Sequence, residues 1–137
     1  MRPVVLAAIS IPLLLLILAA CAIDQNMPEP REGAAIFANN CAACHGYRAT
    51  GNEPLVGGQI APDLTRISAR NSGEFPRSRV LSQIDGYGRG KVSTDIMPQF
   101  GTLLEGDLVP VEVDGVLTPT PRPLAALLSF LESIQTR

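Results

Sequence analysis

Cys41-Ala42-Ala43-Cys44-His45, followed directly by Gly46, is the stretch of this chain that determines its expected fold. In a helical conformation, Cys41, Cys44 and His45 stand at positions i, i+3 and i+4. Side chains at these spacings project from one face of a single helical turn. The stretch therefore predicts two thiols and one imidazole that are presented together.

This set of side chains matches the chemistry of haem attachment. Two thiols three residues apart can form thioethers with the two vinyl groups of a haem, and the adjoining imidazole can then bind the iron. The pattern C-x-x-C-H is the sequence pattern of c-type haem attachment. We therefore expect Cys41 and Cys44 to carry a haem covalently and His45 to be an iron ligand.

Three other interpretations apply to the same stretch. A structural zinc site needs four Cys or His ligands, but beyond this stretch the chain has only Cys21 and no second histidine. A thioredoxin-like redox pair should lie near a βαβ pattern, which the flanking sequence lacks. A chance match on a structural turn is disfavoured because cysteine is otherwise almost absent. Haem attachment is the interpretation that the sequence favours.

Composition indicates one domain with a thin protein core. The chain has 137 residues, of which 46% are apolar but only 4% aromatic, and it contains no Trp. This length fits a single domain, and a buried porphyrin would supply the apolar bulk that the side chains lack. The formal net charge is −2, or −3 once Arg2 is removed with a leader. Nothing in this balance indicates a nucleic-acid partner.

The N-terminal segment is apolar. No charged residue occurs between Arg2 and Asp24, which predicts a signal sequence or membrane anchor over residues 1–20. Three outcomes remain open: lipidation of Cys21 in the lipobox-like sequence LAAC at 18–21, cleavage after an A-x-A site at 20–22, or an uncleaved membrane span. Each outcome places the remaining chain outside the cytoplasm. We therefore expect a bacterial periplasmic protein, anchored at Cys21 or by the apolar segment.

The exported part divides into a tether over residues 21–30 and a domain over residues 31–137. About four helices are expected in the domain: one from Pro30 toward Cys41, a short one after an Asp63 N-cap, one from Pro76 to Gly86, and one from Pro123. Alternating valines and the dipeptide Asp114-Gly115 predict a small β-ribbon near 108–118. The expected fold class is all-α with this ribbon as an insertion.

The second iron ligand is less constrained by the pattern. A single histidine excludes two histidine ligands within one chain, which leaves Met97, Met27, Lys91 or no ligand. Met97 precedes Pro98 at the end of a polar loop, where a helix is unfavourable, whereas Met27 lies in the tether. A Met beside Phe100 can also simply fill the core. Met97 is the ligand that we expect.

Pro62 is a candidate for orienting the iron-bound imidazole. A metal-bound histidine usually donates its second ring N–H to a carbonyl or carboxylate, which fixes its orientation. The carbonyl group of Pro62 lies on a rigid backbone and suits this role, although a simple turn proline is an equal alternative. Leu64 follows directly in the expected short helix.

Charges are segregated along the domain. Residues 66–91 carry six basic and two acidic side chains, whereas residues 95–114 carry five acidic and none that is basic. Such blocks are usually ordinary solvated surface. Our hypothesis is that they orient a redox partner protein.

The motifs together resemble those of a class I c-type cytochrome. They are CAACHG near the start of the domain, PDL at 62–64, MPQFG at 97–101 and a leucine-rich last helix ending SFLESI. The resemblance implies a cytochrome c fold of about four helices around one covalently bound haem c. It further implies that Cys41, Cys44, Pro62 and Leu64 contact the haem, that His45 and Met97 are its axial ligands, and that Gly33 and Phe37 cross the last helix near Phe130. The chain departs from the pattern in its long Val-rich ribbon at 104–120, which leaves the partner-binding face open.

The function implied is electron transfer without catalysis. A haem iron with two protein ligands has no open position and can only exchange an electron, and a Met ligand beside His raises its potential. We expect a single-haem electron carrier on the outer side of a bacterial membrane. Two alternatives remain: a cytochrome subunit of a periplasmic dehydrogenase or oxidase, and a haem enzyme or gas sensor with an open iron site.

Overall fold

The computed structural model describes residues 27–51, 60–87 and 97–136. The expected leader, Cys21 and most of the expected tether lie outside these residues, as does Lys91. Within the described ranges, no helix combines the length and the apolar character that crossing a bilayer requires.

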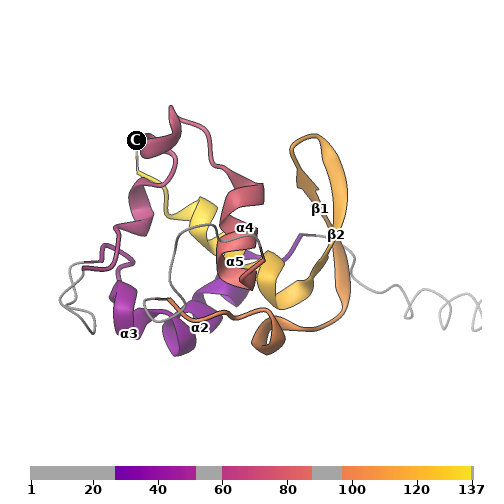
Figure 1. Cartoon of the computed structure of the whole chain (residues 1–137), viewed down its shortest axis with the longest axis horizontal. Coiled ribbons are helices and arrows are strands. Elements are labelled where there is room, and N and C mark those ends of the chain that lie inside the picture. The colour runs from indigo at the N-terminus through magenta and orange to yellow at the C-terminus, as the bar shows by residue number, and fades with distance from the viewer. Residues whose placement is uncertain (1–26, 52–59, 88–96, 137) are drawn as a thin grey trace, which may run out of the picture.

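Four α-helices, three short 3₁₀ turns and one β-ribbon make up the described chain (Figure 1). The helices are α2 (Pro30–Asn40), α3 (Ala42–His45), α4 (Arg77–Asp85) and α5 (Arg122–Ser133). The 3₁₀ turns are η1 (Leu64–Arg66), η2 (Ala69–Asn71) and η3 (Thr102–Leu104). The strands are β1 (Leu108–Val113) and β2 (Val116–Pro121), which pair antiparallel. The helical prediction is confirmed in outline, although the ribbon means that the domain is not strictly all-α.

Helix boundaries follow local chemistry with small departures from expectation. Pro30 opens α2 at its first turn, where its missing N–H costs nothing. Gly86 ends α4 in the left-handed conformation, with φ of 101°. Pro76 caps α4 from outside instead of opening it, and α5 begins one residue early, at Arg122.

The short helix expected after Asp63 is a single 3₁₀ turn. The Asp63 carboxylate accepts hydrogen bonds from the backbone N–H of Thr65 at 2.8 Å and from its hydroxyl at 2.6 Å. This cap satisfies the orphan N–H of the turn. The pKa of Asp63 is lowered, mainly by the Thr65 hydroxyl.

Helices α2 and α5 cross with their backbones in close contact. A Cβ atom placed on Gly33 would overlap the carbonyl oxygen of Ala126 and would lie 2.7 Å from Cβ of Phe130. One helical turn further along α2, the rings of Phe37 and Phe130 pack with their centroids 5.1 Å apart and their planes tilted by 47°. The predicted crossing of Gly33 and Phe37 with the last helix near Phe130 is therefore present.

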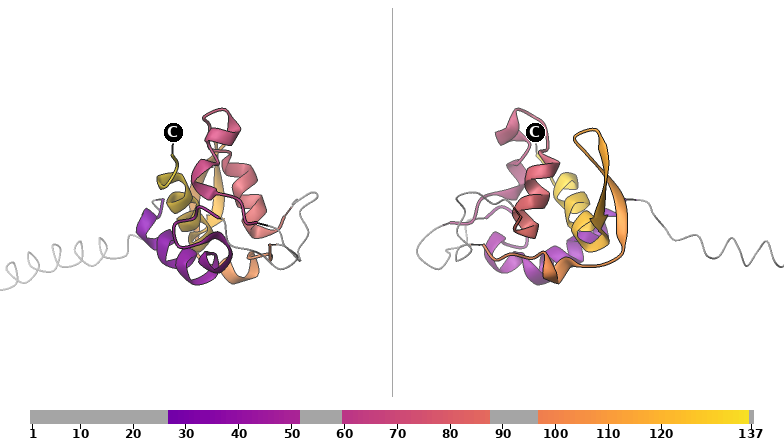
Figure 2. Two further views of the ribbon diagram at one scale, coloured as in Figure 1. Left: turned by 90° about the vertical axis from the view of Figure 1, so that its left-hand side faces the viewer. Right: turned by 45° about the vertical axis from the view of Figure 1, so that its right-hand side comes forward.

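The ribbon packs one face on the helices and exposes the other. Val109, Val111 and Thr120 are buried, and α5 contacts both strands. Asp114 and Gly115 form the turn, both with positive φ, as the Asp-Gly pair predicts. The ribbon lies on the far side of α4 and α5 from α3 (Figures 1 and 2).

Arg77 joins the ribbon to both neighbouring helices. Its guanidinium donates two hydrogen bonds to the Glu132 carboxylate in α5, at 2.6 and 3.1 Å. A third nitrogen lies 2.8 Å from the backbone oxygen and 3.1 Å from the carboxylate of Glu112 in β1. These contacts raise the pKa of Arg77, chiefly through Glu132. One side chain of α4 thus links the ribbon to α5, in addition to the packing of the buried ribbon face.

Candidate haem site

The CAACH stretch forms the compact turn that its spacing predicts. Cys41 ends α2 with φ of −119°, and α3 begins directly after it. The Cys41 carbonyl accepts hydrogen bonds from the backbone N–H of Cys44 at 3.2 Å and of His45 at 2.9 Å. Both cysteines are free thiols. The three side chains line one cavity.

His45 is buried and faces the carbonyl of Pro62. The residue is only 8% exposed, and Nδ1 lies 3.3 Å from the Pro62 oxygen. Because that oxygen can only accept, the contact assigns the proton to Nδ1 and leaves Nε2 with its lone pair. Burial lowers the pKa of His45, with the Pro62 carbonyl acting in the opposite direction. The ring is therefore neutral at pH 7, which is the form that binds a metal.

The Cys41 thiol stays protonated at neutral pH. Burial, and secondarily the neighbouring Cys44, raises its pKa to about 11. A thiol in this state is a weak nucleophile. Spontaneous reaction of Cys41 with an electrophile is therefore suppressed.

Backbone hydrogen bonds bring Pro62 and Leu64 beside the CAACH stretch. The backbone N–H of Gly51 bonds to the His45 carbonyl at 2.9 Å, and that of Leu64 to the Ala49 carbonyl at 2.8 Å. Gly51 has φ of 70°, and a Cβ there would overlap the Ala61 oxygen. Backbone hydrogen bonds thus fix the 61–64 segment beside His45.

A cavity of about 530 Å³ unites the predicted site residues. Cys41, Cys44, His45, Pro62, Leu64 and Met97 all line it, with a mostly apolar wall from Phe37, Ile67, Val80, Ile84, Phe100, Leu127 and Leu131. Met27 does not line it but packs against the core. The Met97 sulfur accepts a hydrogen bond from the Gln83 amide at 3.6 Å. Cysteine, imidazole and thioether therefore meet in one apolar space, and this donor set fits a haem.

Several lining residues escaped the sequence analysis. Helix α4 contributes Arg79, Val80, Gln83 and Ile84, and its N-cap residue Pro76 also lines the cavity. Their spacing of i, i+3, i+4, i+7 and i+8 is one helical face. Arg79 and Gln83 are the polar members of this face, and an apolar periodicity does not mark polar residues. Arg70 and Asn71 of η2 also line the cavity, and no pattern in the sequence marked them.

The zinc interpretation gains no support. Across residues 27–51, 60–87 and 97–136, no group of three or more His, Cys, Asp or Glu side chains is placed to hold a metal ion. An apolar cavity of this size instead falls within the range of small-molecule and cofactor sites, roughly 300–1,000 Å³. The geometry defines a cofactor-binding helical domain.

Comparison with protein families identifies the class. The cytochrome c family model matches residues 30–134, so the chain belongs to the cytochrome c family. Its cofactor is one covalently attached haem c, and the chain is a haem-binding electron-transfer protein. Neither the curated proteins nor the solved structures searched gave a match.

Proposed function

We propose that this chain is a single-haem electron carrier in which Cys41 and Cys44 bear the haem and His45 and Met97 are its axial ligands. The observation that carries the proposal is the one cavity lined by all four side chains. Pro62 would orient His45, since its carbonyl faces Nδ1, and Leu64 would pack against the porphyrin.

Each residue has a distinct physical role in this arrangement. The two thiols would add across the vinyl groups of the haem, each forming one C–S bond and giving its hydrogen to the neighbouring carbon. His45 keeps Nε2 unprotonated because Nδ1 is held by the Pro62 carbonyl. The apolar wall excludes water, and the Gln83 amide positions the Met97 sulfur. The bound haem supplies reversible one-electron exchange at its iron.

Iron ligation by both His45 and Met97 would favour a carrier over a haem enzyme, because no position would remain open. The sixth ligand is tested by Met97→Ala, with Met27→Ala as the matched control because Met27 does not line the cavity. We expect the charge-transfer absorption of Met-bound ferric haem to be lost in Met97→Ala alone. Rapid CO binding by the reduced wild-type protein would instead favour the open-site alternative.

Covalent attachment has its own test. The purified exported protein should keep its colour through acid-acetone extraction, and tryptic peptides containing Cys41 and Cys44 should gain the mass of one haem. Extraction of the pigment would contradict the attachment.

We further propose that the protein works in the bacterial periplasm, held at the membrane by a lipid on Cys21 or by its N-terminal apolar segment. The sequence of residues 1–21 supports this proposal. Mass spectrometry of the mature N-terminus distinguishes a lipidated Cys21, a soluble protein beginning at Ile23, and an uncleaved leader.

A second candidate function is that of a cytochrome subunit in a periplasmic dehydrogenase or oxidase. The outer face of the ribbon favours it, because Leu108 and Leu117 are 61% and 68% exposed. We expect a stoichiometric complex with an oxidoreductase to dissociate in Leu117→Ser if the ribbon is the contact. A monomeric wild-type protein in membrane extracts would favour the carrier instead.

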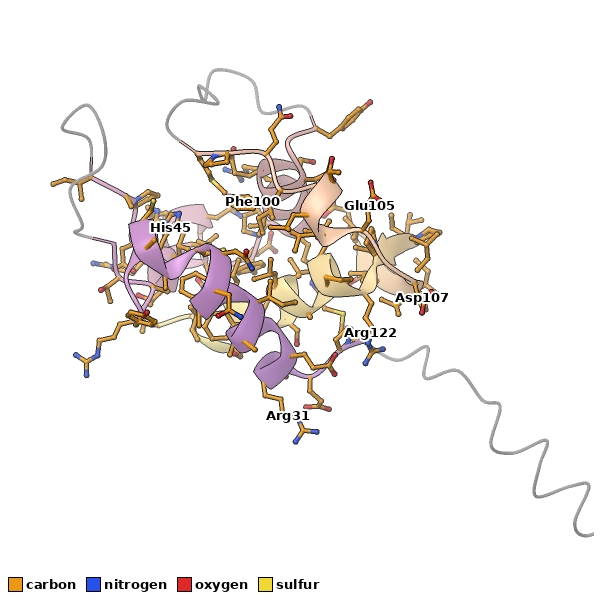
Figure 3. The ribbon with its side chains drawn as sticks, turned by 90° about the horizontal axis from the view of Figure 1, so that it is seen from below. Arg31, His45, Phe100, Glu105, Asp107 and Arg122 are labelled. Carbon is orange, nitrogen blue, oxygen red and sulfur yellow. The ribbon has the colours of Figure 1, made fainter. Side chains whose placement is uncertain are left out.

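The acidic and basic side chains of the domain could orient a redox partner, because they lie in different places. Glu105 and Asp107 lie at the opposite end of the domain from His45 (Figure 3), whereas Arg70 and Arg79 line the haem cavity. A partner with a complementary field would be steered to one end. We expect the rate of partner reduction to change steeply with ionic strength, and a salt-independent rate would contradict this.

A further inference from the structure

The last described residues of the chain lie beside the segment that contains Pro62 and Leu64. Gln135 and Thr136 follow α5, and the end of the described chain lies next to η1 and η2 (Figures 1 and 2). Gln135 contacts Leu64 across a separation of 71 positions in the sequence. Tertiary packing therefore brings the end of the chain to a segment that lines the haem cavity.

Gln135 is half-buried and uses both ends of its side-chain amide. Its nitrogen Nε2 donates hydrogen bonds to the carbonyl of Leu64 at 2.8 Å and to that of Leu131 at 2.6 Å. Its oxygen Oε1 accepts a hydrogen bond from the backbone N–H of Ser68 at 2.9 Å. A glutamine amide has two N–H donors and one carbonyl acceptor, so both donors and the acceptor are used. The reversed amide would face two carbonyl groups with its oxygen, which fixes the orientation of the side chain.

Further hydrogen bonds hold the same segment. The backbone N–H of Thr136 donates to the Thr65 carbonyl at 2.8 Å, and the Thr136 hydroxyl group donates to the same oxygen at 3.1 Å. The backbone N–H of Leu64 donates to the Ala49 carbonyl at 2.8 Å. Leu64 is therefore held through its N–H by the loop that follows CAACH and through its carbonyl by Gln135.

Only a short stretch of backbone separates this contact from the imidazole of His45. The Pro62 carbonyl, two residues before Leu64, lies 3.3 Å from Nδ1 of His45. Partners of this kind orient a metal-bound imidazole and tune its basicity. We propose that Gln135 is a positioning residue for His45, which fixes Leu64 against α5 and thereby keeps the Pro62 carbonyl at Nδ1. This inference rests on the proposed ligation of the iron by His45.

Solvent exchange of the Nδ1 proton distinguishes this role from a purely structural one. If Gln135 only stabilised the fold, its loss would lower the free energy of unfolding and leave the hydrogen bond between Nδ1 and Pro62 intact. If Gln135 positions the Pro62 carbonyl, its loss weakens that hydrogen bond and opens the proton to exchange. His45 is the single histidine of the chain, so its ring protons can be assigned without ambiguity in NMR spectra of the reduced, diamagnetic holoprotein.

The experiment compares two substitutions of Gln135 with Arg77→Met. Gln135→Met keeps the approximate size of the side chain and removes all three hydrogen bonds, whereas Gln135→Glu keeps the acceptor for Ser68 and loses both donors. Because the Leu64 carbonyl loses its donor in both variants, the Nδ1 proton should exchange about ten times faster than in the wild type, as expected for the loss of one or two ordinary hydrogen bonds.

Arg77→Met is the matched control for general destabilisation. It also removes hydrogen bonds to α5, but the partners of Arg77 are Glu132 and Glu112, outside the segment that contains Pro62 and Leu64. We expect the Nδ1 proton of this variant to exchange at the wild-type rate, even though its free energy of unfolding is lower.

Three outcomes would overturn the assignment. Wild-type exchange rates in both Gln135 variants would show that Pro62 is held without Gln135. A wild-type rate in Gln135→Glu alone would show that the contact with Ser68, and not that with Leu64, is the one that matters. Equal acceleration in Arg77→Met would show a general loosening of the fold. Failure of the proposed ligation is recognised separately in the wild type, whose His45 ring protons would then lack the large upfield shift that a porphyrin ring current gives to an axial ligand.

Discussion

Substitution of Gly33 by Ala tests the helix crossing on which the haem site is built. Intrinsic helix propensity alone predicts a gain of about 1 kcal/mol for Gly33→Ala. The structure predicts the opposite sign, because the new methyl group would overlap the Ala126 carbonyl and lie 2.7 Å from Phe130 Cβ. A backbone neighbour cannot rotate away, so α2 and α5 must separate. Overpacking of a close-packed interface costs about 1–3 kcal/mol, and here we expect the upper end of this range.

The net effect should be a loss of about 2 kcal/mol in the free energy of unfolding. Guanidinium denaturation of the oxidised holoprotein, followed by far-UV circular dichroism and haem absorbance, measures it. Ala35→Gly on the exposed side of α2 is the control and should lose about 1 kcal/mol through propensity alone. A Gly33→Ala protein that is about 1 kcal/mol more stable than the wild type would refute the crossing argument, since propensity would then be the only effect.

Three further perturbations have defined outcomes. Arg77→Met should lower the free energy of unfolding by about 1–2 kcal/mol, because it leaves the half-buried Glu132 carboxylate without its donors; unchanged denaturation midpoints at low and high salt would contradict this. Asp63→Ala should cost about 1 kcal/mol at pH 7 through loss of the cap. The pKa of Asp63 is lowered from 3.8 in the fold, so its contribution to stability is present above this pH and is lost as the pH falls through the folded-state pKa. The thermal midpoints of wild type and variant should therefore converge on acidification. Protein expressed without haem attachment should lose the cooperative thermal transition of the holoprotein, and a sharp transition at the same temperature would show that the core is complete without cofactor.

Local signals in the sequence were sufficient for much of the fold. Pro30, Gly86 and the Asp114-Gly115 turn are positions where backbone geometry alone selects the residue, so the element boundaries near them could be predicted. The CAACH spacing likewise encodes its own geometry, because all three side chains lie within one turn. Such features depend on neighbours in the chain and need no tertiary information.

Other features depend on contacts between distant segments and could not be predicted. That Arg70 and Arg79 line the same cavity depends on how η2 packs beside α4, where Arg79 donates to the Asn71 oxygen. Arg77 and Arg79 are the same residue type in the same short segment of sequence. Arg77 nevertheless contacts the ribbon and Glu132 instead of lining the cavity. Two positions along a helix separate these roles, since a shift of two residues turns a side chain to nearly the opposite face.

The helices of this domain, which has few aromatic residues, meet around a cavity. Phe37 of α2, Val80 of α4 and Leu127 of α5 line the same cavity as Cys44 and His45 of α3, so these helices pack partly against whatever fills it. The porphyrin would therefore be a core component as much as a redox group, and a substitution in this wall should change stability and potential together. The ribbon is different, because its described residues do not line the cavity and it is held from outside by Arg77. Changes on its exposed face should therefore alter partner binding while leaving the potential of the haem unchanged.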